Sequence, residues 1–313
     1  MINFIIRRLA MLALMFVLVS MLIFALTQVL PGDVTTMVLG RFASPEAKAA
    51  LRDQLGLDRS LPVQYASWLA HFVRGDWGTS VSLRSGIAHL ILDRSINSLY
   101  LAFVALMMFA PLGIVLGLLA GLRRGTWLDS SLSIGSLAFI GLPEFVTGLL
   151  LISVFAIQLG WLPASSFIPP GTNFVEAFPK LILPGMTVAL TSLAYVLRMT
   201  RASTVEVMKM DYVRTARLKG LPPYKVLFGH VLRNALLPTV TIIAVSIGWL
   251  VGGLIITESL FGYPGLGRLV LFAVQRRDLP LIQATTMLIV AVVMLSNLTA
   301  DILYAYLNPR IRY

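Results

Sequence analysis

The chain contains six stretches of mainly apolar residues that are each long enough to cross a bilayer as a helix. A transmembrane helix needs about 20 such residues. The chain is 58% hydrophobic and only 12% charged, which leaves too little polar surface to cover a soluble globule of 313 residues. We therefore predict an all-α, polytopic membrane protein. Its six predicted transmembrane helices are approximately Leu9 to Leu30, Leu99 to Leu122, Leu132 to Leu159, Leu181 to Met199, Leu236 to Thr257 and Leu281 to Leu307.

The first apolar stretch follows Arg7 and Arg8, as the apolar part of a signal peptide would. It is longer than the roughly 7 to 15 residues of such a segment, and no A-x-A cleavage site follows it. We predict that residues 1–30 form a retained first transmembrane helix. Cleavage is the alternative.

Lysine and arginine residues are unevenly distributed between the two sides of the predicted bundle. If the N-terminus is cytoplasmic, 14 of the 25 basic residues lie on that side together with only three acids. The other side then carries 11 basic residues and nine acids. Because cytoplasmic loops are enriched in Lys and Arg, this pattern predicts that both termini are cytoplasmic. Membrane topology accounts for the net charge of +11. The charge is therefore no evidence that the protein binds nucleic acid.

Residues 31–97 form an outer segment that is too long to be a simple connector. Ser44 before Pro45, with Gly56 at the end of "PEAKAALRDQLG", is the pattern of a capped helix. A second helix is predicted from Pro62 to Gly75. The segment reads as a small helical subdomain, more typical of a cap over the bundle than of a substrate site.

Residues 98–313 are predicted to form a five-helix core, with a long inner loop at about 200–235. Asp211 is predicted to cap a short helix that ends at Gly220, before Pro222 and Pro223. One face of this helix, formed by Tyr212, Thr215, Ala216 and Lys219, has small residues at its centre. Such a face suits close insertion into a groove on another protein. The alternative is an ordinary positive-inside loop.

The stretches "DYVRTARLKGL" and "HVLRNALLPTVT" resemble the cytoplasmic loop of ABC importer permeases of the dipeptide and oligopeptide subgroup. "QVLPGD", "LGLDRSLPVQYASWL", "GDWGTSV", "LGWLPA", "ESLFGYPGLGRL" and "NPRIR" extend the resemblance over nearly the whole chain. Two of the departures from the usual pattern are Leu218, where Ala is commoner, and Asn308 in place of an Asp.

The resemblance implies the type I ABC importer permease fold in a bacterial cytoplasmic (inner) membrane. It also implies a second homologous permease, two cytoplasmic ATPase subunits that bind ATP and Mg, and an extracytoplasmic solute-binding protein as partners. Membrane lipid surrounds the spans. The chain itself has no G-x-x-x-x-G-K-[ST] phosphate loop, so we predict neither enzyme activity nor a cofactor of its own.

By this resemblance, the inner loop is the element that the ATPase grips. In the implied mechanism, basic side chains pair with carboxylates around the ATPase groove, small ones permit close approach, and Arg233 and Asn234 fix the returning part of the loop. The predicted coupling residues are Arg201, Asp211, Tyr212, Arg214, Thr215, Ala216, Arg217, Lys219, Gly220, Arg233 and Asn234.

Several residues inside the predicted spans are polar or very small. Glu144, after Pro143, is a candidate for the translocation path, although satisfying local polar groups is the favoured role. Asn297 and Asp301 share one helical face, where interhelical hydrogen bonding is favoured over path lining. Gly113, Gly117 and Gly121 form a stripe of small residues that predicts close helix packing.

Peptides are the expected substrate, and nickel complexes, glutathione and oligosaccharides are the alternatives within the family. An ion-coupled secondary transporter is the competing class, but the two halves show no internal repeat. A membrane anchor for a soluble complex is a third class, and it does not explain six spans. The three His residues are scattered and there is no Cys, so no metal site is predicted.

Overall fold

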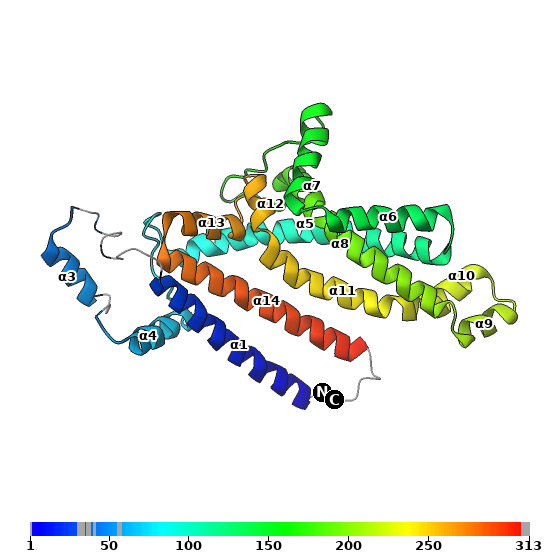
Figure 1. The fold of residues 1–313 in the computed structure, drawn as a ribbon, viewed down its shortest axis with the longest axis horizontal. Helices are drawn as coiled ribbons and strands as arrows, with labels where there is room; N and C mark the ends of the chain where they lie inside the picture. Colours follow the sequence, from blue (N-terminus) through cyan, green and yellow to red (C-terminus); the bar gives the residue numbers. More distant parts are fainter. Residues whose placement is uncertain (1, 30–34, 36–38, 40–41, 55–57, 308–313) are drawn as a thin grey trace. The chain divides into compact units, whose positions relative to one another are not determined.

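The computed structural model describes residues 2–29, 35, 39, 42–54 and 58–307, and their regular structure is almost entirely helical (Figure 1). One isolated β-bridge joins Thr79 and Gly86. The helices are α1 (Ile2–Val29), α3 (Pro45–Gln54), α4 (Leu61–Val73), α5 (Ile87–Leu122), α6 (Trp127–Gly141), α7 (Glu144–Leu151), the π-helical η1 (Ile152–Gln158), α8 (Phe174–Val207), α9 (Asp211–Leu218), α10 (Pro223–Val226), the π-helical η2 (Leu227–Val231), α11 (Leu232–Gly253), α12 (Ile255–Leu260), α13 (Leu266–Arg276) and α14 (Leu279–Leu307).

Five of the predicted spans correspond to long apolar helices. Within the described residues, these are Ile6–Gln28, Ile87–Leu122, Phe174–Val207, Pro223–Leu250 and Leu279–Ile302. The prediction of a polytopic all-α membrane protein is therefore confirmed. Leu30, the predicted end of the first span, lies outside the described residues.

The third predicted span is not one continuous helix. It consists of α6 and the α7–η1 segment, which meet at an angle of 108°. Pro143 has no N–H to continue a helix, and it restricts the residue before it to extended conformations. Leu142 accordingly has φ −83° and ψ 129°. The predicted third span is therefore interrupted at Pro143, and Glu144 begins a new helix.

The chain divides into two compact units, the first comprising residues 1–97 and 264–292. Within this unit, α1 packs on α4 through Phe24, whose ring centroid lies 5.6 Å from that of Tyr65 and 5.8 Å from that of Trp68. The buried carboxylate of Asp278 accepts hydrogen bonds from the Ser80 hydroxyl (2.6 Å) and the backbone N–H of Ser82 (2.8 Å). These contacts fix the turn before α5 against the start of α14.

The two predicted outer helices are present as α3 and α4. The Ser44 hydroxyl accepts a hydrogen bond from the N–H of Ala47 at 3.2 Å, as expected of a capping side chain. After α4, Gly75 has φ +82°, a left-handed conformation that favours glycine. Gly56, the predicted end of the first helix, lies outside the described residues.

Helix α13 was not predicted. The chain turns within the run "GYPGLG" at Gly262, which has φ +64°. The eleven residues that follow Gly265 form α13, which buries Leu266, Leu269 and Ala273. A helix of eleven residues is too short to cross a bilayer, so a prediction based on long apolar stretches does not find it.

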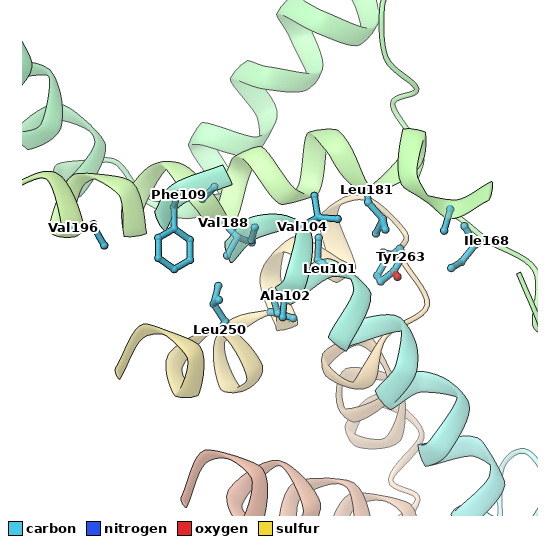
Figure 2. Packing of buried hydrophobic residues seen from close by; sticks show 14 residues of the cluster. Leu101, Ala102, Val104, Phe109, Ile168, Leu181, Val188, Val196, Leu250 and Tyr263 are labelled. Carbon is cyan, nitrogen blue, oxygen red and sulfur yellow. The ribbon is translucent and has the colours of Figure 1, made fainter. Parts of the chain in front are cut away.

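The second unit comprises residues 98–263 and 293–313. Its core lies where α5, α8 and α11 meet, and it includes Leu101, Phe109, Val188, Leu250 and Tyr263 (Figure 2). Because lipid tails are as apolar as these side chains, close van der Waals packing between the helices is what stabilises this core. Residues 264–292 belong to the first unit together with the predicted outer segment, and the predicted division into domains stays a prediction.

The glycine stripe on α5 lies directly against α8. A Cβ atom on Gly117 would lie 2.6 Å from the carbonyl oxygen of Leu197 and 2.6 Å from Cβ of Thr200. A Cβ on Gly113 or Gly121 would lie 2.8 or 2.7 Å from side-chain atoms of α8. Such distances leave no room for a side chain, so the predicted close packing of the glycine stripe is confirmed.

Candidate functional site

The segment α9–α10–η2 connects α8 to α11 and forms a folded surface element beyond the ends of these two helices (Figure 1). It has its own small apolar core. Val213 and Ala216 of α9 are buried against residues of the neighbouring helices, namely Val207, Val226, Val231 and Ala235. This packing holds an eight-residue helix in place that would not be stable on its own.

The ends of α9 agree only in part with the sequence prediction. Met210, not Asp211, occupies the N-cap position, and no side chain caps this end by a hydrogen bond. Asp211 is instead the first residue of the helix, where a carboxylate interacts favourably with the positive end of the helix dipole. The predicted stop is correct, because Gly220 has φ +75° just after the helix.

Of the predicted docking face of α9, Tyr212, Thr215 and Lys219 are exposed and Ala216 is not. Ala216 is only 4% exposed and packs into the core of the loop, so it cannot permit the approach of another protein. The outward face is formed by residues at i, i+3, i+4 and i+7, which are Asp211, Arg214, Thr215 and Leu218, all exposed. Leu218 stands out with 79% of its surface exposed.

Asn234 was predicted to fix the returning part of the loop; this role stays a prediction, and in the structure its side chain contacts α9. Its side-chain amide donates a 2.8 Å hydrogen bond to the Tyr212 hydroxyl, which joins the start of α11 to α9. Arg233, its neighbour, is exposed. The Tyr212 hydroxyl therefore accepts a hydrogen bond from within the same chain.

The Tyr212–Asn234 bond gives a modest prediction. Tyr212→Phe removes the hydroxyl and keeps the ring, so we expect a loss of about 1 kcal/mol of loop stability. Hydrogen exchange of the α9 amides should then be faster, while Tyr224→Phe on α10, another exposed tyrosine, should leave it unchanged. Equal exchange in both variants would contradict the anchoring role of the bond.

Arg201 was predicted to belong to the coupling loop but lies within α8. Its guanidinium forms a two-pronged ion pair with Asp129 of α6, one arm of which is the 2.8 Å bond from Nη2 to Oδ2. The Asp129 side chain is only 5% exposed. The Asp129 carboxylate also accepts a 2.9 Å hydrogen bond from the backbone N–H of Gly125. Arg201 therefore joins α6 to α8 and does not lie on the exposed face of the loop.

In the sequence, Asp129 was considered only as one of the three acidic residues on the predicted cytoplasmic side. A signal for its structural role is present in the sequence, since Thr126 precedes it by three residues in a capping-box arrangement. The Thr126 hydroxyl accepts from the N–H of Asp129 at 3.5 Å. The basic partner on α8 is 72 residues away and has no local signal.

Polar side chains inside the second unit form two linked contacts at α12. The carboxylate of Glu144 accepts a hydrogen bond from the hydroxyl of Thr257. The adjacent Glu258 is fully buried and accepts from the Ser98 hydroxyl at 2.6 Å. Glu258 was missed in the sequence because it follows the predicted fifth span. Burial and the nearby Glu258 carboxylate raise the pKa of Tyr263 well above its usual range, so the phenol stays protonated.

Asn297 and Asp301 lie on α14, in the part that belongs to the second unit. A Cβ atom on Gly248 of α11 would lie 3.1 Å from Oδ1 of Asn297, so the amide faces α11 closely. Asp301 is half-buried one turn further on. The structure therefore places Asn297 between two helices, and its predicted interhelical role stays a prediction.

The described residues contain no group of three or more His, Cys, Asp or Glu side chains that could hold a metal ion. The groups brought together here are hydrogen-bonded pairs and ion pairs. They can join helices and bind polar ligands.

Comparison with known proteins covers almost the entire chain. Residues 113–313 match the family described as "Binding-protein-dependent transport system inner membrane component", and residues 1–83 match its N-terminal counterpart. The di/tripeptide transport system permease protein DppB of Pseudomonas aeruginosa is 37% identical over 100% of this chain and 99% of the relative.

Two further relatives have similar identity. A probable peptide ABC transporter permease protein of Sinorhizobium fredii is 36% identical over 99% of both chains. The glutathione transport system permease protein GsiC of Escherichia coli strain K12 is 38% identical over the whole of both chains. The predicted family is thereby confirmed, and it places ATP binding in a separate ATPase and implies a binding protein as a further partner. The chain belongs to the family of binding-protein-dependent transport system inner membrane components and is a multi-pass permease subunit of an ABC transporter.

Proposed function

We propose that this permease forms the translocation path for short peptides in an ATP-driven importer, together with a second homologous permease. The names of the relatives support the substrate class. One transports di- and tripeptides, another is a probable peptide transporter, and the third transports glutathione, which is itself a modified tripeptide. All three relatives are 36 to 38% identical to this chain over the full length. The identities therefore support short peptides as a substrate class and do not favour one of these substrates over another.

The observation that carries the coupling role is the outward face of α9. Asp211, Arg214, Thr215 and Leu218 are exposed on a helix whose opposite side is buried in the loop's own core. A partner that covers this face would bury the exposed Leu218 side chain, and the charged groups beside it would set the register of docking. The proposed partner is one of two ATPase subunits, which bind ATP and Mg.

The proposed orientation follows from charge. Both termini and the loop at 200–235 lie in the cytoplasm, and residues 31–97 lie outside, where the binding protein delivers its substrate. The excess of Lys and Arg over acids on the proposed inner side supports this arrangement. ATP binding would close the ATPases on α9 and drive the spans between inward-open and outward-open states.

The candidates for the path stay Glu144, Asn297 and Asp301. Glu144 lies next to the buried pair formed by Glu258 and Ser98 through its contact with Thr257. Carboxylates in this region can bind the ammonium group or the amide N–H groups of a peptide. Their hydrogen bonds within the chain support a structural role as well, so substrate contact requires a direct test.

Transport is tested with proteoliposomes that contain the purified complex and its binding protein. We expect uptake of radiolabelled dialanine to require ATP on the side of the ATPases. Unlabelled dialanine should compete with the label, whereas an unrelated sugar should not. Uptake driven by an imposed proton or sodium gradient without ATP would contradict the proposal and favour a secondary transporter.

Leu218→Glu is expected to reduce ATP-dependent uptake about tenfold or more, because burial of an unpaired carboxylate at the interface opposes docking. Leu218 is 79% exposed, so the substitution should not affect folding. The measurement is the initial rate of uptake together with the amount of ATPase that co-purifies. Leu218→Met, which keeps size and apolarity, is the control and should retain both. Normal uptake by Leu218→Glu would refute the assigned face.

A further inference from the structure

A partly open pocket of about 530 Å³ lies beside the coupling helix, and neither the transport path nor the proposed ATPase contact uses it. It is lined by Leu122 at the end of α5, by Met208 at the end of α8, and by residues of the α9–η2 segment that include Leu221, Val226 and Leu227. Arg217 is the one charged residue among those that line it. The pocket is thus an apolar groove with a single cation.

Arg217 differs in position from the other basic residues of α9. Its Nη2 lies 3.3 Å from the sulfur of Met208, so the guanidinium extends over the groove. Arg214, one turn earlier, belongs to the outward face with Leu218. The two arginines therefore serve different surfaces of one helix.

The groove lies at the level where spans end. Leu122 is the last residue of the span Ile87–Leu122, and Val226 and Leu227 lie in the first turns of the span Pro223–Leu250. Three exposed basic residues are chain neighbours of residues that line the groove: Arg123 and Arg124 directly follow Leu122, and Lys225 follows Tyr224. Basic pockets between the ends of transmembrane helices bind the head groups of anionic lipids.

We propose that this groove binds one anionic phospholipid, with an acyl chain along the apolar lining and the phosphate at the Arg217 guanidinium. The positive charge of Arg217 complements a phosphate, and a zwitterionic lipid with the same chains lacks the net charge to match. The volume is within the range of small-molecule sites and is larger than a single docking side chain needs. The lipid then braces α9 from the membrane side while its outward face stays free for the ATPase.

The test is native mass spectrometry of the purified complex, titrated with phosphatidylglycerol or with phosphatidylcholine of identical chains. Arg217→Gln should weaken the tightest phosphatidylglycerol binding about fivefold, as expected from the loss of one basic group near a lipid head. Arg214→Gln, the same change on the outward face, should leave it unaltered. Phosphatidylcholine should bind less tightly to the unmodified chain, and Arg217→Gln should not change its binding.

Leu221→Trp is a second variant, which fills the groove and should abolish the tightest binding of both lipids. The proposal is overturned if Arg217→Gln binds phosphatidylglycerol as well as the unmodified chain does, or if both lipids bind equally. It is also overturned if inorganic phosphate displaces the lipid, or if Leu221→Trp loses the ATPase and keeps the lipid. Recovery of the ATPase is a separate readout: if Leu218→Glu leaves it unchanged while Arg217→Gln weakens lipid binding, the proposed coupling face fails and the lipid site stands.

Discussion

Arg201→Met is expected to destabilise the chain by about 3 kcal/mol, since it leaves the buried carboxylate of Asp129 without its cation. The Asp129 side chain is 5% exposed and that of Arg201 is 31% exposed, so water can replace only part of the lost interaction. The pair also joins α6 to α8, and its loss should loosen the contact between these two helices. The measurement is thermal unfolding of the purified protein in detergent, followed by intrinsic fluorescence.

Two further variants make this test specific. Arg198→Met removes an exposed arginine one turn earlier in α8 and should have little effect. The double variant Arg201→Met with Asp129→Asn removes both charges and should recover a large part of the stability. If Arg201→Met and Arg198→Met unfold at the same temperature, the ion pair does not contribute as described.

Gly117→Leu is expected to prevent the normal packing of α5 against α8. A Cβ on this residue already approaches the Leu197 carbonyl oxygen to 2.6 Å, and backbone atoms cannot move aside as the end of a flexible side chain can. Overpacking typically costs 1 to 3 kcal/mol, and we expect about 3 kcal/mol or more because the contact is with backbone. The measurement is the fraction of protein that elutes as a monodisperse peak after extraction.

Gly135→Leu provides the matched control for this variant. Gly135 also lies in an apolar helix, and a Cβ on it would meet no atom within 4 Å. Leucine at this position should be tolerated, and it gains helix propensity. Equal loss of folded protein in the two variants would mean that added bulk in any span is harmful, contrary to the packing described for the glycine stripe.

Much of the architecture could be predicted from the sequence because membrane physics restricts the choice. Apolar runs of sufficient length have to be helices, and the glycines at every fourth position of α5 mark the face that meets another helix. The sequence did not reveal the 108° bend at Pro143. A proline in an apolar run can kink a helix or end it, and the outcome depends on what the next segment packs against.

The candidate site was predicted less completely. The motif around residues 211–220 located the short helix, but periodicity alone could not tell which side of it is buried. Val213 and Ala216 are buried because Val207 and Val231, from elements before and after α9, cover them. The pairing of Arg201 with Asp129 likewise depends on how α6 and α8 meet, which no local pattern encodes.

Cysteine cross-linking tests the central claim, that the outward face of α9 docks on the ATPase, most directly. The chain contains no cysteine, so single substitutions provide unique thiols without further engineering. A short thiol-reactive photo-cross-linker on Thr215→Cys or Leu218→Cys should capture the ATPase in native membranes. The same reagent on Val213→Cys or Ala216→Cys, both buried in the loop, should not. Capture from the buried positions and not from the outward ones, or from neither, would contradict the account.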